Sequence, residues 1–442
     1  MGIDLLNRVV RSGGLVGAVW LCSLGTALAM PPIQHWQTTN GARVYYVPAP
    51  ELPMVDIRVV FAAGSVRDAG LPGLASMTNH LLDKGAAGLT ANDLAARLEG
   101  LGAELGSGSL RDMAWVSLRS LSDAALLEPA LEVLQQVLGQ PDFNALDFER
   151  ERERTLVSLR EDEQSPSTIA EYRFYRVVFG EHPYATRPVG DAASLQRMTP
   201  EDIRAFYEQY YVAGNAVIAI VGDVDRKAAE RLAERIAGAL DDGKAAPAIP
   251  VVAALEDASE ERIFHPSTQT HVRMGAPGMR RGDPDYFPLY VGNHILGGGG
   301  LVSRLNEEIR EKRGLSYSVY SYFSPMAQDG PYVFGLQTRN DQLDEALEVM
   351  RATLKTFHEE GPTEEELVAA RKNITGGFAL RVDSNSKIVE YLAMIGFYML
   401  PLDYLVTFNA RVEAVTREQI RDAFRRRVPV DHMATVIVGG EK

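Results

Sequence analysis

The chain has 442 residues, with 45 lysines and arginines against 59 aspartates and glutamates, which gives a formal net charge of −14. This acidic balance argues against nucleic acid as a partner, and the single cysteine, Cys22, excludes disulfides within the chain and thiolate metal sites. The length exceeds that of one ordinary core and favours two or three domains.

The first expected element is an export signal in residues 1–29. Arg8 and Arg11 precede an apolar stretch from Leu15 to Leu24, and the segment ends in an Ala-Leu-Ala triplet. Basic, apolar and small residues in this order are typical of a cleavable signal peptide. The apolar stretch is shorter than the ~20 residues that a spanning helix needs, so we expect no stable membrane anchor. Retention of the segment as an anchor is the alternative.

The remaining sequence repeats itself with an offset of roughly 215 residues, and the repeated segments keep their order. The repeat predicts a duplicated chain, with an N-terminal domain at residues 30–245 and a C-terminal domain at residues 246–442. The matching pairs are Asn79-His80-Leu81-Leu82 with Asn293-His294-Ile295-Leu296, Ala130 to Val133 with Ala346 to Val349, Thr199 to Arg204 with Thr416 to Arg421, and Ile220 to Gly222 with Ile437 to Gly439.

Hydrophobic patterning predicts the same order of elements in both halves. Apolar patterning indicates strands, at Val55 to Phe61, Trp115 to Leu121 and Ala216 to Val221 in the first half, and at His271 to Gly275, Tyr332 to Gln337 and Ala434 to Val438 in the second. Helices are expected over Phe143 to Asp162, Leu301 to Lys312 and Thr363 to Val382, and Asp241 to Glu261 reads as a linker. This order is typical of an α+β fold with a mixed sheet backed by helices in each domain.

Several motifs carry a resemblance to one family. Ala63-Gly64-Ser65 and Lys84-Gly85 flank a helix-like stretch in residues 70–85, and the run from Ile295 to Tyr320 contains Gly-Gly-Gly, Ser-Arg-Leu and Gly-Leu-Ser-Tyr-Ser-Val. Together they resemble the insulinase/pitrilysin superfamily of zinc metallopeptidases, in its short two-domain bacterial branch, which is related to mitochondrial processing peptidase. The resemblance implies that the two domains form half of a clam-shaped chamber in which peptides are degraded. For a bacterial protein with an export signal, it implies a periplasmic location.

The zinc motif of that family is degraded in this chain. In such peptidases His-x-x-Glu-His on one helix supplies two zinc ligands and the general base, and a later Glu supplies the third ligand. The resemblance places Ser76, Asn79 and His80 on the motif and Ser158 on the third ligand; a shift of three residues would offer Glu161. A catalytic zinc normally has three protein ligands, so the chain itself is expected to bind no metal and no cofactor. We expect His80 to be an ordinary hydrogen-bonded or half-buried histidine.

A second group of family residues is present. Arg310 and Tyr317 match an Arg and a Tyr that, in the family, face the zinc site from the second domain. Guanidinium and phenol groups are hydrogen-bond donors that can hold a substrate carbonyl and stabilise its oxyanion, so the resemblance implies catalytic and substrate-binding roles for both residues. It also implies that the glycine-rich segment with Gly298 and Gly299 helps to shape the peptide cavity.

These features lead to one functional hypothesis and two alternatives. The chain is expected to be the non-zinc subunit of a heterodimeric zinc peptidase, in which a homologous subunit carries His-x-x-Glu-His and the zinc, and a peptide substrate extends as an added strand. The first alternative is a non-enzymatic peptide-binding or scaffold protein of the same family. The second is a single-chain enzyme with an unusual metal site at His80 and Glu161.

Overall fold

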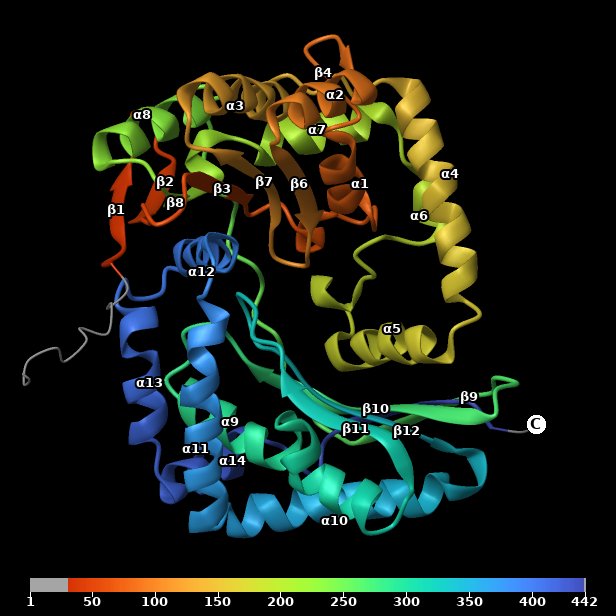
Figure 1. Cartoon of the computed structure of the whole chain (residues 1–442). Helices are drawn as coiled ribbons and strands as arrows, with labels where there is room; N and C mark the ends of the chain where they lie inside the picture. Colours follow the sequence, from red (N-terminus) through yellow and green to blue (C-terminus); the bar gives the residue numbers. More distant parts are fainter. Residues whose placement is uncertain (1–30, 441–442) are drawn as a thin grey trace, which may run out of the picture.

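The structure is a computed structural model that describes residues 31–440, so the expected signal peptide lies outside the described residues. Two halves lie one above the other in Figure 1, and each contains one sheet with helices packed on it. In the part of the chain that is described, no helix is long and apolar enough to cross a membrane.

The upper sheet has six strands in the order β1-β2-β8-β3-β7-β6. Only β2 and β8 run parallel; the other neighbouring strands are antiparallel. Every residue of the central strand β8 is buried, which explains its continuous apolar sequence. The strands are β1 (Gln34–Gln37), β2 (Arg43–Pro48), β3 (Met54–Phe61), β6 (Glu104–Ser109), β7 (Ala114–Leu121) and β8 (Ala216–Gly222), and a separate hairpin is formed by β4 (Gly85–Ala86) and β5 (Leu89–Thr90).

The lower sheet repeats this arrangement with five strands in the order β11-β12-β10-β13-β9. It has one parallel pair, β13 with β9, and then three antiparallel pairs from β13 to the edge strand β11. The upper sheet has the same pattern, with the parallel pair β8 and β2 and three antiparallel pairs from β8 to β6. The shared order confirms the predicted α+β fold with duplicated domains. The strands are β9 (Ser259–Ile263), β10 (Gln269–Met279), β11 (Ser316–Phe323), β12 (Gly330–Arg339) and β13 (Ala434–Val438).

Helices cover the outer face of each sheet (Figure 1). The upper layer contains α1 (Leu74–Leu81), α2 (Ala91–Leu101), α3 (Ala124–Gly139), α7 (Pro200–Tyr210) and α8 (Arg226–Ala237), with α4 (Ala145–Asp162) and α6 (Ala192–Arg197) at one side. The lower half contains α9 (Tyr286–Asn293), α10 (Leu343–Glu360), α11 (Glu364–Phe378), α13 (Tyr404–Ala414) and α14 (Arg417–Arg427). Helices α7 and α14 both begin with a capping box, at Thr199 and Thr416, which satisfies backbone N–H groups of the first turn.

The two halves exchange one helix each. Helix α5 (Pro166–Phe179) comes from the first half but packs on β10 and β13 of the lower sheet, while α12 (Asn385–Phe397) comes from the second half and packs on β2, β3 and β8 of the upper sheet. Gly396 permits this contact, because a Cβ there would lie 2.6 Å from the ring of Tyr45. The exchange means that each sheet is covered on one face by a helix from the other half.

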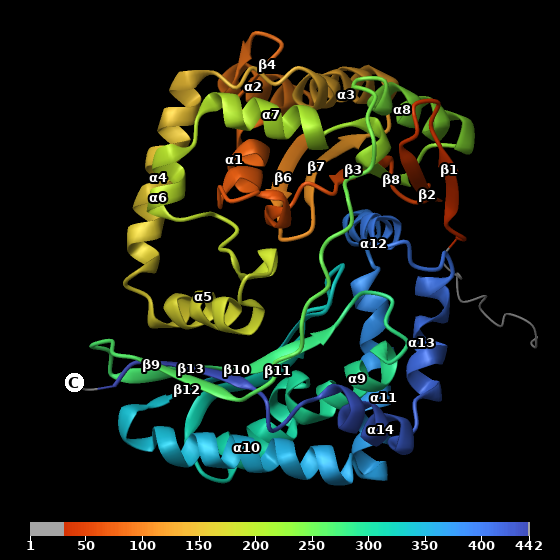
Figure 2. The same ribbon diagram turned by 180° about the vertical axis from the view of Figure 1, so that it is seen from behind.

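The halves are also joined by a linker and by one buried carboxylate. The segment 242–258 contains no helix or strand and runs from the upper to the lower half (Figure 2); the domain division at residues 245 and 246 falls within it and stays a prediction. Asp112, in the β6–β7 turn, is 2% exposed and accepts hydrogen bonds from Tyr184 (2.6 Å), Tyr398 (2.9 Å) and the Ala327 backbone N–H (2.7 Å). One side chain therefore connects the upper sheet, the end of α12 and the β11–β12 turn.

Candidate functional site

Helix α1 carries the degraded motif and is held at its start by Asp68. The chain enters the helix through Gly73, whose φ of +94° favours glycine. The carboxylate of Asp68 accepts hydrogen bonds of 2.8 Å from the backbone N–H groups of Gly73 and Ala75. Asp68 is 3% exposed, and burial raises its pKa to about 7 although these hydrogen bonds act in the opposite direction. The cap fixes the position of the face that bears Ser76 and His80.

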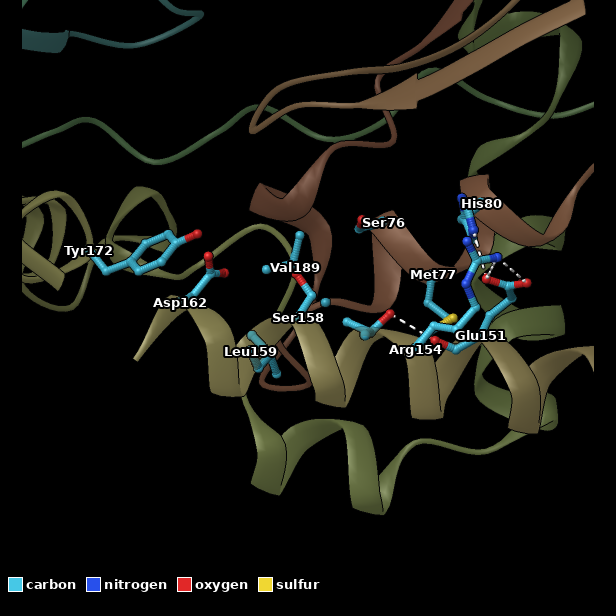
Figure 3. A pocket seen from close by; sticks show the side chains of 12 residues that line it. Ser76, Met77, His80, Glu151, Arg154, Ser158, Leu159, Asp162, Tyr172 and Val189 are labelled. Atoms are coloured by element: carbon cyan, nitrogen blue, oxygen red, sulfur yellow. Dashed lines mark hydrogen bonds and ion pairs between the residues drawn. The ribbon is translucent and has the colours of Figure 1, made fainter. Parts of the chain in front are cut away.

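A cavity of about 360 Å³ lies between this face of α1 and helix α4. Ser76, His80, Glu151, Arg154 and Ser158 all line it, as Figure 3 shows. His80 and Glu151 are joined by a 2.9 Å contact between Nε2 and Oε2, and the His80 side chain is 49% exposed. This contact agrees with the expectation of a hydrogen-bonded or half-buried histidine.

Glu151 is the charged centre of the cavity and was missed in the sequence. It is 2% exposed, and Arg154 Nη1 lies 3.1 Å from Oε2 of the same carboxylate. Burial opposes ionisation of Glu151, but the hydrogen bond from His80 and the charge of Arg154 outweigh burial and lower its pKa. The spacing of Phe148, Glu151 and Leu159 could have indicated it, because these residues share the buried face of α4 and Glu151 is the charged one among them.

The residues of this cavity do not fit a zinc ion. Ser76 and Ser158 line it but are neutral, and Arg154 already neutralises Glu151. Glu161, the alternative ligand considered from the sequence, is exposed and does not line the cavity. Throughout residues 31–440, no three His, Cys, Asp or Glu side chains are grouped to hold a metal. Within the described residues, Glu161 therefore does not share the cavity with His80, and the geometry does not support a site made by these two residues.

Asn79, at the general-base position, belongs to the core. It is 2% exposed and its amide donates hydrogen bonds to the backbone carbonyl of Trp115 (3.1 Å) and to the hydroxyl of Tyr211 (3.3 Å). Asn79 is not among the residues that line the cavity. This position therefore connects α1 to β7 and offers no group to a substrate.

Restoring two ligands should restore zinc binding without activity. One ring nitrogen of His80 is bound by Glu151, which leaves the other for a metal, as in many zinc sites. The double variant Ser76→His, Ser158→Glu would complete three protein ligands, and we expect it to bind about one zinc per chain. Elemental analysis after dialysis measures this, with Ser76→His alone as the matched control that lacks the third ligand. Peptide hydrolysis should stay absent, and zinc content no higher than in the unmodified protein would show that the assignment of Ser158 is wrong.

The helix expected from Leu301 to Lys312 is interrupted. A 3₁₀ turn spans Gly300–Val302, Ser303 is extended (ψ 153°), and a π-helix spans Asn306–Glu311. Ser303 is fully buried, its hydroxyl donates to the carbonyl of Gly300 at 2.7 Å, and its own carbonyl accepts from the N–H of Glu307. Ser303 therefore ends the 3₁₀ turn with its side chain and bonds the start of the π-helix with its backbone carbonyl. Short π-helices are frequent at functional sites, and this one bears Arg310.

Arg310 and Tyr317 are brought together by this π-helix and the strand that follows it. The guanidinium carbon of Arg310 lies 5.0 Å from the centroid of the Tyr317 ring, so the two side chains stack. Tyr317, on edge strand β11, is 81% exposed, and the nearest carboxylate to Arg310 is that of Glu311, at 3.6 Å. Both groups therefore present donors to solvent. Their proximity agrees with the expectation, and their catalytic roles stay predictions.

Gly298 and Gly299 have a packing reason to be glycine. Residues His294–Gly298 form a π-helix and Gly299 is a bend that follows it, so only part of the glycine-rich segment is helical. A Cβ on Gly298 would lie 2.7 Å from the amide nitrogen of Asn293, and one on Gly299 would lie 2.7 Å from the carbonyl oxygen of His294. Side chains at either position would disturb the π-helix. Their expected role in substrate binding stays a prediction.

Comparison with known proteins identifies the family. Residues 43–190 match the family model for insulinase (peptidase family M16), and residues 197–374 match the model for the peptidase M16 inactive domain. A crystal structure of a peptidase M16 inactive domain from Pseudomonas fluorescens is 40% identical, with a TM-score of 0.90, over 93% of this chain and 98% of that one. The chain belongs to peptidase family M16.

M16 relatives of two kinds are similar to the chain. A non-peptidase homolog, YmxG, from Helicobacter pylori is 26% identical over 88% of this chain and 90% of its own. An uncharacterized zinc protease from Streptomyces coelicolor is 28% identical over 80% of this chain and 78% of its own. The family predicted from the motifs is confirmed. The inactive-domain model matches residues 197–374, outside the degraded motif, and the relatives include a non-peptidase homolog as well as a zinc protease.

Proposed function

We propose that this chain is the non-zinc subunit of a two-subunit M16 peptidase that degrades peptides in an enclosed chamber. The observation that carries the proposal is an asymmetry between the two halves. The cavity beside α1 has neutral serines at Ser76 and Ser158, whereas the second half presents the partly buried Arg310 stacked on the exposed Tyr317. The zinc, and the water that it activates, would be held by a homologous partner with an intact His-x-x-Glu-His.

The chemistry of the pair suits binding of a peptide carbonyl. A guanidinium group offers several N–H donors, and in the described residues no hydrogen bond occupies the hydroxyl of Tyr317, which is 81% exposed. Both can donate to the carbonyl oxygen, and their hydrogen bonds strengthen as negative charge develops on that oxygen. Loss of one such donor typically costs about 10²–10³-fold in rate.

The surroundings of the pair suit an extended peptide. Strand β11 is the edge of the lower sheet, and β12 is its one paired neighbour within residues 31–440. An extended peptide can add to such an edge through main-chain hydrogen bonds. Leu301 and Val302, on the preceding 3₁₀ turn, are 66% and 77% exposed. Exposed apolar side chains beside the edge favour contact with a substrate or with the partner subunit.

The proposed location is the periplasm, and it rests on residues 1–29 alone. The order of Arg8, Arg11 and the apolar stretch that follows indicates export, and cleavage after Ala29 would release the mature subunit. The export signal does not separate the proposed function from the non-enzymatic alternative, since an exported scaffold protein would have the same signal.

Reconstitution with a zinc-bearing homologue tests the function. The chain would be expressed with an M16 homologue from the same genome that carries His-x-x-Glu-His, and the two would be copurified through a tag on one of them. We expect a stable complex that cleaves unstructured peptides, no cleavage by this chain alone, and loss of cleavage when the Glu of the homologue's motif is replaced by Gln. If this chain with zinc is as active alone as in the mixture, the subunit assignment is wrong. If it binds peptides but no combination cleaves them, the non-enzymatic alternative holds.

A further inference from the structure

The lower half contains a second cavity, at the place where the sequence repeat puts the counterpart of the degraded zinc motif. It has a volume of about 470 Å³ and lies where α9 and the π-helix His294–Gly298 meet strand β11. The repeat pairs Asn79-His80 with Asn293-His294, and His294 lines this cavity as His80 lines the other. The two cavities differ in chemistry, because the second has no acidic residue in its lining.

The cavity is lined by two arginines and a histidine and, within the described residues, by no carboxylate. Arg281, Arg381 and His294 line it, in a chain whose formal net charge is −14. Neither arginine forms a salt bridge with any residue in the described range 31–440. A pair of uncompensated guanidinium groups in one concave site favours an anionic ligand.

Two polar atoms here are buried and have no partner. They are Nε of Arg281 and Nε2 of His294. A buried donor without an acceptor is unfavourable, so such atoms need an explanation, and a ligand that offers oxygen acceptors provides one. Burial, with the nearby charge of Arg381, lowers the pKa of His294, so its neutral ring can donate one hydrogen bond.

Aromatic rings form the walls and hold one of the arginines. Tyr286 stacks on Tyr290 with centroids 5.7 Å apart, and Tyr320 stacks on Tyr322 at 5.9 Å. The Tyr290 hydroxyl accepts a 2.9 Å hydrogen bond from Nη1 of Arg381 and so orients the guanidinium. Apolar walls exclude water, which strengthens a charge-assisted hydrogen bond inside them.

The position of the cavity relates it to Arg310 and Tyr317. Tyr317, Tyr320 and Tyr322 belong to the same edge strand, β11. At ~3.3 Å per residue, Tyr320 and Tyr322 lie roughly 10 and 17 Å along the strand from Tyr317. A peptide added to this edge beside Tyr317 would therefore reach the cavity about three to five residues away.

We propose that this basic cavity binds a carboxylate of the peptide substrate, either its C-terminus or an acidic side chain, and thereby fixes where the peptide lies along β11. The proposal rests on the proposed function, since it assumes that peptides enter the chamber. The cavity would give the subunit a preference for peptides that carry a carboxylate. Arg310 and Tyr317 alone would not create this preference, because their proposed partner is a backbone carbonyl.

Binding of three matched peptides tests the proposal. The probe is a fluorescein-labelled decapeptide of glycine, serine and alanine, prepared as the free acid, as the C-terminal amide, and as the amide with one glutamate near its end. Fluorescence anisotropy with the mature chain should show the free acid bound about tenfold more tightly than the plain amide, as expected for a charge-assisted pair worth about 1.4 kcal/mol. If the glutamate-containing amide binds as tightly as the free acid, the cavity accepts any carboxylate. If it binds as weakly as the plain amide, the cavity is specific for the C-terminal carboxylate.

Variants separate this cavity from general charge attraction. Arg281→Gln with Arg381→Gln should abolish the difference between free acid and amide, whereas Arg280→Gln, an exposed neighbour outside the cavity lining, should preserve it. Thermal melting confirms that the variants fold. Equal affinities for the free acid and the amide, or a difference that survives in the double variant, would overturn the proposal. If the complex with the zinc-bearing homologue still cleaves both peptides in that case, the proposed function stands; if it cleaves neither, the proposed function fails as well.

Discussion

Replacing Arg310 by alanine is expected to lower kcat/KM of the reconstituted two-subunit peptidase about 100-fold, the usual cost of removing an oxyanion donor. Tyr317→Phe removes the hydroxyl and keeps the ring that stacks on Arg310, so a loss of at least about tenfold in kcat is expected with little change in the fold. Steady-state hydrolysis of a fluorogenic peptide by the complex measures both effects.

Lys312→Ala is the matched control, because it removes a neighbouring positive charge that has no proposed contact with the substrate. Lys312 lies two residues from Arg310, is about half exposed, and pairs with Glu307 and Glu308, contacts that contribute little to stability. Its kcat/KM should stay within about twofold of the unmodified complex. If Arg310→Ala and Tyr317→Phe were as active as Lys312→Ala, the stacked pair would be a structural contact only, and the proposed division of roles between the subunits would lose its support.

Replacing Asp112 by alanine is expected to lower the free energy of unfolding by about 3–5 kcal/mol, because three hydrogen-bond donors lose their acceptor and each costs about 1–3 kcal/mol when it is left unsatisfied. The substitution leaves the hydroxyls of Tyr184 and Tyr398 and the N–H of Ala327 without their acceptor. Burial raises the pKa of both tyrosines, so they remain protonated and cannot compensate by ionising. Urea denaturation followed by circular dichroism measures the loss.

Two further variants test whether the loss of stability comes from the missing acceptor oxygens of Asp112. Asp112→Asn keeps one acceptor oxygen and should lose less stability than Asp112→Ala. Asp344→Ala removes a carboxylate that is 90% exposed and only 3.8 Å from Arg262, so a change within about 0.5 kcal/mol is expected. A loss below about 1 kcal/mol for Asp112→Ala would show that the contact between the halves does not depend on this carboxylate.

The strands and the duplication could be predicted because they depend on local patterns. Apolar patterning, continuous in β8 and alternating in β7, locates β3, β7, β8, β10, β12 and β13, and the collinear repeat indicates that the two sheets share one topology. The pair Arg310 and Tyr317 could be named from motifs, and the structure stacks the two side chains.

Other features depend on contacts between distant segments and could not be predicted in this way. The spacing of Glu151 with Phe148 and Leu159 indicates the buried face of α4, but only the packing of α4 beside α1 places this carboxylate against His80. The break at Ser303 depends on a hydroxyl that bonds a carbonyl three residues earlier, which apolar spacing does not indicate. Helices α5 and α12 are positioned by packing on the sheet of the other half, and nothing in their own sequences indicates which sheet they cover.

The exchanged helices set an order of events during synthesis. Domains usually fold as units as they leave the ribosome, N-terminal first. Here the inner face of the upper sheet, with Val217 and Ala219, shares one apolar core with Val389 and Leu392 of α12, which are made close to the end of the chain. The first half therefore cannot bury that face until almost the whole polypeptide exists. We expect the nascent chain to depend on a chaperone until residue 397 has emerged, and a fragment that ends at residue 245 to aggregate.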